Sequence, residues 1–168
     1  MRLALVAVAA CAASTPPPNA PMPADVGSAF APFKIIAGDW TGTGGGRTGP
    51  SKGHFSLRPD LGGHVLLRRS DNESAEGRHE DLTVIYSSGP DQYRAVYFDG
   101  EGHTIQYTVT GPTPSTLVFL SDEVPQAPRF RLTYTMAGDR GTVGFEIAPP
   151  GTTAFQTYVS GDLQRVKP

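Results

Sequence analysis

Apolar and polar residues alternate with a period of two along most of the chain. The clearest run begins at His103, after which Ile105, Tyr107 and Val109 alternate with threonine and glutamine. This alternation is typical of a strand with one buried and one exposed face. The preceding loop, Asp-Gly-Glu-Gly at 99–102, has turn chemistry, because glycine adopts positive φ without steric cost. We therefore predict a hairpin over residues 93–109, with His103 at the head of its apolar face.

Similar runs recur about every ten residues, as in barrels and sandwiches. After a first strand that Trp40 opens, they predict strands over residues 51–58, 63–70, 79–87, 92–98, 103–110, 115–121, 128–136, 141–148 and 153–165. Short turns rich in glycine, proline, aspartate and asparagine separate them, which favours pairing between sequence neighbours. Because closure removes unpaired edges, we predict an all-β, up-and-down antiparallel barrel of about ten strands.

A different pattern precedes the strands. Phe30, Phe33 and Ile36 recur at three-residue spacing between Ser28, a plausible N-cap, and Gly38. We predict a short helix there, lying over one mouth of the barrel; the alternative is an irregular lead-in segment. The glycines of residues 38–46 indicate either a strongly bent strand or close backbone approach. A phosphate loop is disfavoured, because no Gly-Lys-Ser/Thr sequence follows them.

The N-terminus has the pattern of an export signal. One arginine precedes a short apolar run that ends in Val-Ala-Ala-Cys at 8–11, and this run is too short to span a bilayer. The sequence around Cys11 resembles the bacterial lipobox, in which the cysteine is lipidated and becomes the mature N-terminus. We predict that residues 1–11 are this signal; ordinary cleavage near Ala13 is the alternative. By resemblance to sorted lipoproteins, Ala12 favours the outer membrane and hence the periplasmic face of the envelope.

Residues 12–27 contain five prolines and little apolar bulk, so we expect a disordered tether, followed by the barrel domain at 28–168. The formal net charge of −2 argues against nucleic acid as a main partner, since phosphate binding needs clustered basic residues. The one basic pair, Arg68-Arg69, alternates across a strand, and we predict that both side chains are solvated. With a single cysteine, no intrachain disulfide can form. Membrane contact is expected only through the lipid anchor.

His103 is the strongest candidate for chemistry. It lies beside Asp99 and Glu101, and a carboxylate there could orient the imidazole or raise its pKa. One interpretation is general acid/base catalysis in a hydrolase or isomerase, with Tyr97 or Tyr107 as partner. The other is that His103 bonds a loop carboxylate and holds its own turn. No nucleophile motif or glycosidase-type carboxylate pair accompanies it.

Metal binding is not expected from the sequence. Histidines 54, 64, 79 and 103 belong to different segments, and the local group His79-Glu80-Asp81 alternates between the two faces of one strand. Arg131 lies on the face opposite Tyr134, where we predict a salt bridge to Glu146 on the next hairpin.

A ten-stranded barrel is wide enough to leave a cavity, and aromatic-lined cavities are typical small-molecule sites. The first hypothesis is therefore a barrel that binds a small, largely apolar ligand in its lumen. The residues that we predict to contact this ligand are Trp40, Tyr97, His103, Tyr107, Arg131, Tyr134 and Tyr158. The alternatives are the hydrolase or isomerase above and a purely structural envelope protein.

Two resemblances support the barrel. Gly-Asp-Trp-Thr-Gly-Thr-Gly-Gly-Gly at 38–46 is similar to the start of the nitrobindin-like calycins, ten-stranded barrels that bind haem. The segments 56–66, 97–109, 127–134 and 145–151 resemble an uncharacterised bacterial family with a lipocalin-like, calycin-type barrel, and this resemblance covers most of residues 30–165. In nitrobindins a histidine of the last strand ligates haem. Tyr158 stands at that position here, and we expect no cofactor.

Overall fold

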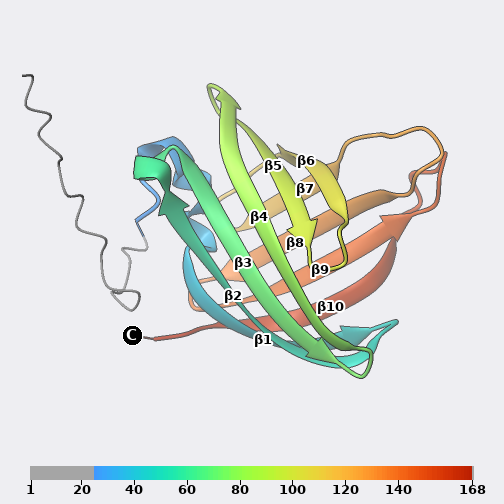
Figure 1. Cartoon of the computed structure of the whole chain (residues 1–168). Helices are drawn as coiled ribbons and strands as arrows, with labels where there is room; N and C mark the ends of the chain where they lie inside the picture. The colour runs from blue at the N-terminus through green and yellow to red at the C-terminus, as the bar shows by residue number, and fades with distance from the viewer. Residues whose placement is uncertain (1–24, 168) are drawn as a thin grey trace, which may run out of the picture.

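The computed structural model describes residues 25–167, which form a closed barrel of ten antiparallel strands (Figure 1). Every strand pairs with its sequence neighbours, and β10 closes on β1, as predicted. The strands are β1 (Gly38–Gly46), β2 (Gly49–Asp60), β3 (Val65–Ser74), β4 (Gly77–Gly89), β5 (Gln92–Asp99), β6 (Thr104–Thr110), β7 (Thr116–Ser121), β8 (Arg129–Ala137), β9 (Arg140–Ala148) and β10 (Gln156–Arg165). Two short 3-10 helices accompany them, η1 (Ser28–Ile35) and η2 (Leu61–Gly63).

The helix η1 closes one end of the barrel. It is a 3-10 helix that begins after Gly27, without a side-chain cap, so the predicted Ser28 N-cap is wrong. The helix is kinked at Phe30, where φ is −122°, and Ile36 is its C-cap. Phe30, Phe33 and Ile36 are nevertheless all buried, each at most 1% exposed. The Phe33 ring lies 5.1 Å from that of Tyr93 on β5. The predicted helix over one mouth is therefore present.

Val26, at the end of the predicted tether, packs against the barrel domain. It is 2% exposed and belongs to the core. The predicted signal, Cys11 and most of the tether lie outside the described residues. Within residues 25–167, no helix combines the length and hydropathy needed to cross a membrane.

The β3–β4 hairpin is longer than the alternation predicts. Residues 71–74 continue β3, although Asp71-Asn72 reads as a turn, and the chain reverses instead at 75–76. Both faces of this extension are polar, and Arg78 bonds Asp71 across it at 2.5 and 2.9 Å. Without an apolar face, a strand gives no alternation to detect.

The glycines of β1 allow close backbone approach to β10. A side chain at Gly44 would place its Cβ 2.1 Å from the Ser160 carbonyl oxygen, and one at Gly46 would place it 2.0 Å from that of Tyr158. These positions tolerate no side chain unless the strands move apart. The second of the two sequence interpretations is thus correct for this stretch.

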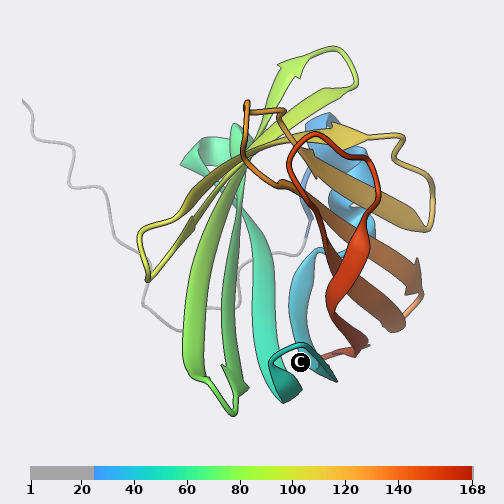
Figure 2. The ribbon, with the colours of Figure 1, turned by 90° about the vertical axis from the view of Figure 1, so that its right-hand side faces the viewer.

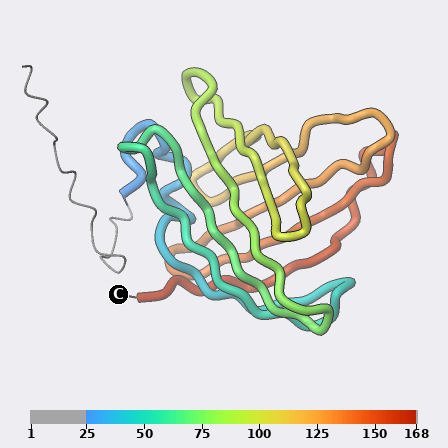
Figure 3. Tube along the Cα trace, viewed as in Figure 1, coloured from blue at the N-terminus to red at the C-terminus, as the bar shows by residue number. Residues whose placement is uncertain are grey.

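The lumen has an apolar half and a polar half. Apolar side chains fill the half next to η1, whereas buried Arg68, Ser70, Thr83 and Ser121 face inward farther along the strands. Figures 2 and 3 show β2 to β4 crossing one wall and β7 to β10 crossing the other. The turn 100–103 lies at the end opposite η1, together with the turns after β1, β3, β7 and β9.

Candidate functional site

A cavity of about 80 Å³ lies in the polar half of the lumen and is partly open to solvent. Phe55, Val143 and Leu163 supply an apolar wall, and Arg68 and Tyr134 supply a polar one. Strands β1, β2 and β10 contribute four glycines to the lining, at positions 42, 44, 53 and 161. These residues have no side chain to fill the lumen, so the cavity exists where the glycine-rich strands pass.

Arg68 is buried inside the barrel, which corrects the prediction that it is solvated. It follows Leu66 on the inward face of β3, and its side chain is 10% exposed. Its Nη1 donates to Asp81 Oδ1 at 2.5 Å, and Asp81 is itself 6% exposed. The guanidinium lies 5.1 Å from the Phe55 ring centroid. Burial opposes the charge of Arg68, but Asp81 and Tyr134 more than compensate and raise its pKa.

Two buried polar atoms of residues that line this cavity have no hydrogen-bond partner among the described residues. They are the Arg68 Nε and the Tyr134 hydroxyl, both fully buried. Burial raises the pKa of Tyr134, so its hydroxyl keeps its proton at neutral pH. Most buried polar groups in folded proteins are satisfied, and an unsatisfied one requires an explanation.

A second polar group lies at the rim, on the β5–β6 turn and the facing part of β4. The Asp99 carboxylate accepts the backbone N–H of Glu101 at 3.1 Å and that of His103 at 2.8 Å. His103 Nδ1 lies 2.9 Å from Asp99 Oδ2, and the His103 side chain is 68% exposed. The hydrogen bond expected if His103 holds its own turn is therefore present. Catalysis by His103 stays a prediction.

His79 joins this rim from β4. Asp81 pairs with Asp99 in the β4–β5 register, so His79, two residues away, reaches the turn. Its Nδ1 lies 3.2 Å from Glu101 Oε1, and its Nε2 lies 2.9 Å from the Tyr97 hydroxyl. Burial, then Asp81 and Asp99, raise the pKa of Tyr97 well above its usual range.

These rim residues include a possible metal-ligand set. One donor atom each from His79, Asp99 and Glu101 lies within 4.8 Å of the others. Imidazole and carboxylate ligands suit first-row divalent cations. Residue spacing within a single strand does not predict this ligand set, because His79 lies on β4, Asp99 on β5 and Glu101 in the turn. The hairpin register is the signal that could have found it.

Of the residues predicted to contact a ligand, only Tyr134 lines the lumen cavity. Trp40 and Tyr107 face inward and, like Tyr134, belong to the packed core, but they do not line the cavity. Trp40 Nε1 donates to the Ile36 carbonyl at 3.0 Å. Tyr97 and His103 lie at the rim. Alternation gives the face of a strand but not the depth along the lumen, so it cannot separate these positions from Tyr134.

Arg131 faces outward, away from the lumen. It makes the predicted salt bridge, donating to the two Glu146 oxygens at 2.6 and 2.9 Å. The guanidinium also lies 4.3 Å from the Phe155 ring centroid. Arg131 therefore stabilises the outer surface across β8 and β9 and does not line the cavity.

The position that would ligate haem in the nitrobindin resemblance does not fit that role here. The Tyr158 ring packs edge-on against Phe145 at 6.2 Å, with Arg47 5.9 Å from its centroid. Tyr158 does not line the lumen cavity. A volume of about 80 Å³ is also far below the roughly 300–1,000 Å³ of ordinary cofactor pockets.

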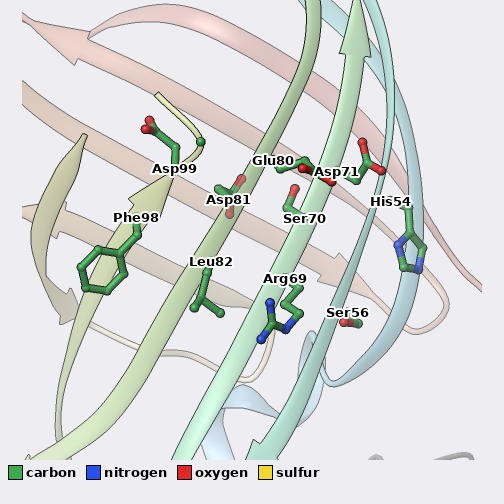
Figure 4. Close-up of a pocket in the computed structure, with 11 residues that line it drawn as sticks. His54, Ser56, Arg69, Ser70, Asp71, Glu80, Asp81, Leu82, Phe98 and Asp99 are labelled. Carbon is green, nitrogen blue, oxygen red and sulfur yellow. The ribbon is translucent and has the colours of Figure 1, made fainter. Parts of the chain in front are cut away.

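A larger concavity lies on the outside of the barrel wall. It measures about 520 Å³ and spans the outer faces of β2 to β5. Figure 4 shows Ser56, Arg69, Leu82 and Phe98 side by side across these four strands. Phe98 is 42% exposed. This groove is an open surface, and its wide exposure makes it a weaker candidate for a small-molecule site than the lumen cavity.

Fold and site together define a closed ten-stranded antiparallel barrel with a small, partly polar cavity in its lumen. No family model matches the chain, and no curated protein matches it. The structure resembles the crystal structure of Rv2717c from M. tuberculosis, with a TM-score of 0.65, 16% identity, and coverage of 85% of this chain and 100% of that one. At this identity the likeness supports the fold alone. The calycin and nitrobindin relationships remain predictions.

A de novo designed fluorescence-activating β-barrel also matches, with 15% identity over 79% of this chain and 95% of the designed one. Its TM-score of 0.41 is too low to support a conclusion about function.

Proposed function

We propose that this protein binds a small molecule in the lumen of its barrel. The observation that carries the proposal is a lumen cavity whose wall combines apolar side chains with two buried, unsatisfied polar atoms. Small-molecule sites typically combine an apolar lining with a few polar groups that fix orientation. The packed half next to η1 supplies a rigid floor for such a site.

The proposed ligand is smaller and less apolar than the sequence alone suggested. Side chains fill the apolar half of the lumen, where Trp40, Leu57 and Leu117 are fully buried. A ligand that enters the remaining volume of about 80 Å³ is limited to a few heavy atoms, or inserts one end group of a longer molecule.

The location is part of the proposal. If Cys11 is lipidated, the predicted tether of residues 12–27 would hold the barrel at the outer membrane, on its periplasmic face. A binding protein held there would meet small molecules that cross the envelope.

The proposal is tested by filling the cavity. Val143 lines it from β9, and Val143→Phe should occupy most of the volume. Leu82→Phe, in the outer groove, is the matched control. With cyclopentanone as the probe and saturation-transfer NMR as the readout, we expect binding to the wild type and Leu82→Phe but not to Val143→Phe. No binding to the wild type, or unchanged binding to folded Val143→Phe, would contradict the proposal.

A further inference from the structure

We infer that the group held in the lumen cavity is an uncharged hydrogen-bond acceptor, such as a carbonyl oxygen, carried on a compact apolar body. This inference rests on the proposed function and specifies the ligand class of the same site. It comes from three properties of the cavity wall: the kind of polar atom left unsatisfied, the charge balance, and the shape of the apolar side.

The unsatisfied atoms require an acceptor. Arg68 Nε carries one hydrogen and can only donate, and the Tyr134 hydroxyl can donate to the same oxygen. Both atoms are buried without a partner and belong to residues that line the same cavity. Burying a donor without an acceptor costs free energy that is recovered when an acceptor arrives. A ligand carbonyl oxygen provides two lone pairs for two donors.

The charge balance excludes a charged group. The Arg68 guanidinium is already paired with Asp81, and both are deeply buried. An anion would add a second negative charge near Asp81, and a cation would face Arg68. Either would be desolvated without a counter-charge, which is costly inside a protein.

The charges at the cavity mouth lead to the same conclusion. Lys52 lines the cavity and is paired with Glu73 at 3.0 Å, and His54, also in the lining, has its Nε2 3.8 Å from Asp39 Oδ1. Asp162, also in the lining, is exposed. Among the described residues, the wall thus offers no uncompensated cation that would attract a carboxylate or phosphate.

The opposite wall favours hydrocarbon. Phe55, Val143 and Leu163 face the cavity with carbon atoms only, and Phe55 stacks on Trp40 with ring centroids 6.1 Å apart, which fixes its plane. An apolar body of the ligand would pack against these three side chains while its oxygen meets the two donors. Small ketones, amides and esters have this combination.

The inference is tested with ligands that share one ring and differ in one group. The probes are cyclopentanone, methylenecyclopentane, cyclopentanecarboxylate and cyclopentylammonium, titrated into the purified protein and followed by amide NMR shifts. We expect cyclopentanone to bind about fivefold or more tightly than the hydrocarbon, as the loss of one hydrogen bond implies, and both ions to bind more weakly than the ketone.

Two substitutions assign the effect to the named atoms. Tyr134→Phe removes one donor, and Arg68→Lys removes Nε while keeping a positive charge opposite Asp81. Each should reduce the preference for ketone over hydrocarbon, whereas Tyr107→Phe, a buried tyrosine of the same lumen that does not line the cavity, should keep it.

The possible failures are distinguishable. Equal binding of ketone and hydrocarbon, an undiminished preference in folded Tyr134→Phe, or tightest binding by either ion would overturn the inference and leave lumen binding in place. If none of the four probes binds, the proposed function itself fails.

Discussion

At the scale of single residues, the main polar feature of the lumen is the buried Arg68, only some of whose N–H groups have a hydrogen-bond partner. Arg68 has its charge balanced by Asp81 but keeps a free Nε beside the equally unsatisfied Tyr134 hydroxyl. A protein selected only for stability would gain by removing such groups, whereas binding sites commonly retain them at a cost in stability. Removing either atom should therefore raise the stability of the ligand-free protein and weaken ligand binding.

The first prediction concerns the stability and the ligand binding of a Tyr134 variant. Tyr134→Phe removes a buried hydroxyl that has no partner, so the ligand-free protein should become more stable, by about 1 kcal/mol. Urea unfolding measures the change, and the same variant should bind the ketone probe less well. A loss of more than about 1 kcal/mol would mean that the hydroxyl is satisfied in solution and is not available to a ligand.

At the scale of elements, the β5–β6 turn is held by Asp99 more than by His103. The Asp99 side chain is 4% exposed and accepts two backbone N–H groups as well as the His103 ring. Hydrogen bonds to a charged, buried acceptor contribute more than those of an exposed side chain.

The second prediction follows from this difference. Asp99→Ala should destabilise the protein by about 2–3 kcal/mol, because two backbone donors lose a charged acceptor. His103→Gln should cost less than about 1 kcal/mol, since its ring is exposed. Thermal unfolding of both variants gives the comparison. Equal losses would show that the imidazole itself holds the turn.

The third prediction concerns pH and the β8–β9 pair. Hydrogen bonds from Arg131, opposed by burial, lower the pKa of Glu146. A carboxyl group with a lowered folded-state pKa contributes stability above its unfolded pKa, about 4.3, and that contribution is lost as pH falls through the folded value. Glu146→Gln should therefore flatten the fall in stability below pH ~4.3. Urea titrations at several pH values measure the slope, and an unchanged slope in the variant would contradict the prediction.

Alternation was sufficient to predict ten strands, apart from the polar end of the β3–β4 hairpin, and the short turns between them predicted the closed meander. It was not sufficient to predict the site. Trp40, Tyr107 and Tyr134 all face inward, yet only Tyr134 lines the cavity. Depth depends on where η1 inserts and on the registers between strands. Arg68 lies two residues after Leu66, on the same face of β3, so alternation predicts its burial. Its charge predicts exposure, and here the position along the strand decides.

At the scale of the whole molecule, the barrel is one unit, and the predicted lipoprotein signal lies outside the described residues. The fourth prediction is that Cys11→Ser abolishes lipidation. The wild-type protein should partition into the membrane fraction and show globomycin-sensitive processing, whereas the variant should do neither. If the wild type already yields a soluble mature form, cleavage near Ala13 is the better interpretation.

The central claim is that the lumen, and not the outer groove, receives a small molecule. Amide NMR shifts during a cyclopentanone titration test it directly, because β1 and β10 line only the lumen cavity and β4 and β5 line only the outer groove. We predict the largest shifts at Gly42, Gly53 and Gly161, which line the lumen cavity. Shifts concentrated at Arg69, Leu82 and Phe98 in the outer groove, or none at all, would contradict the account.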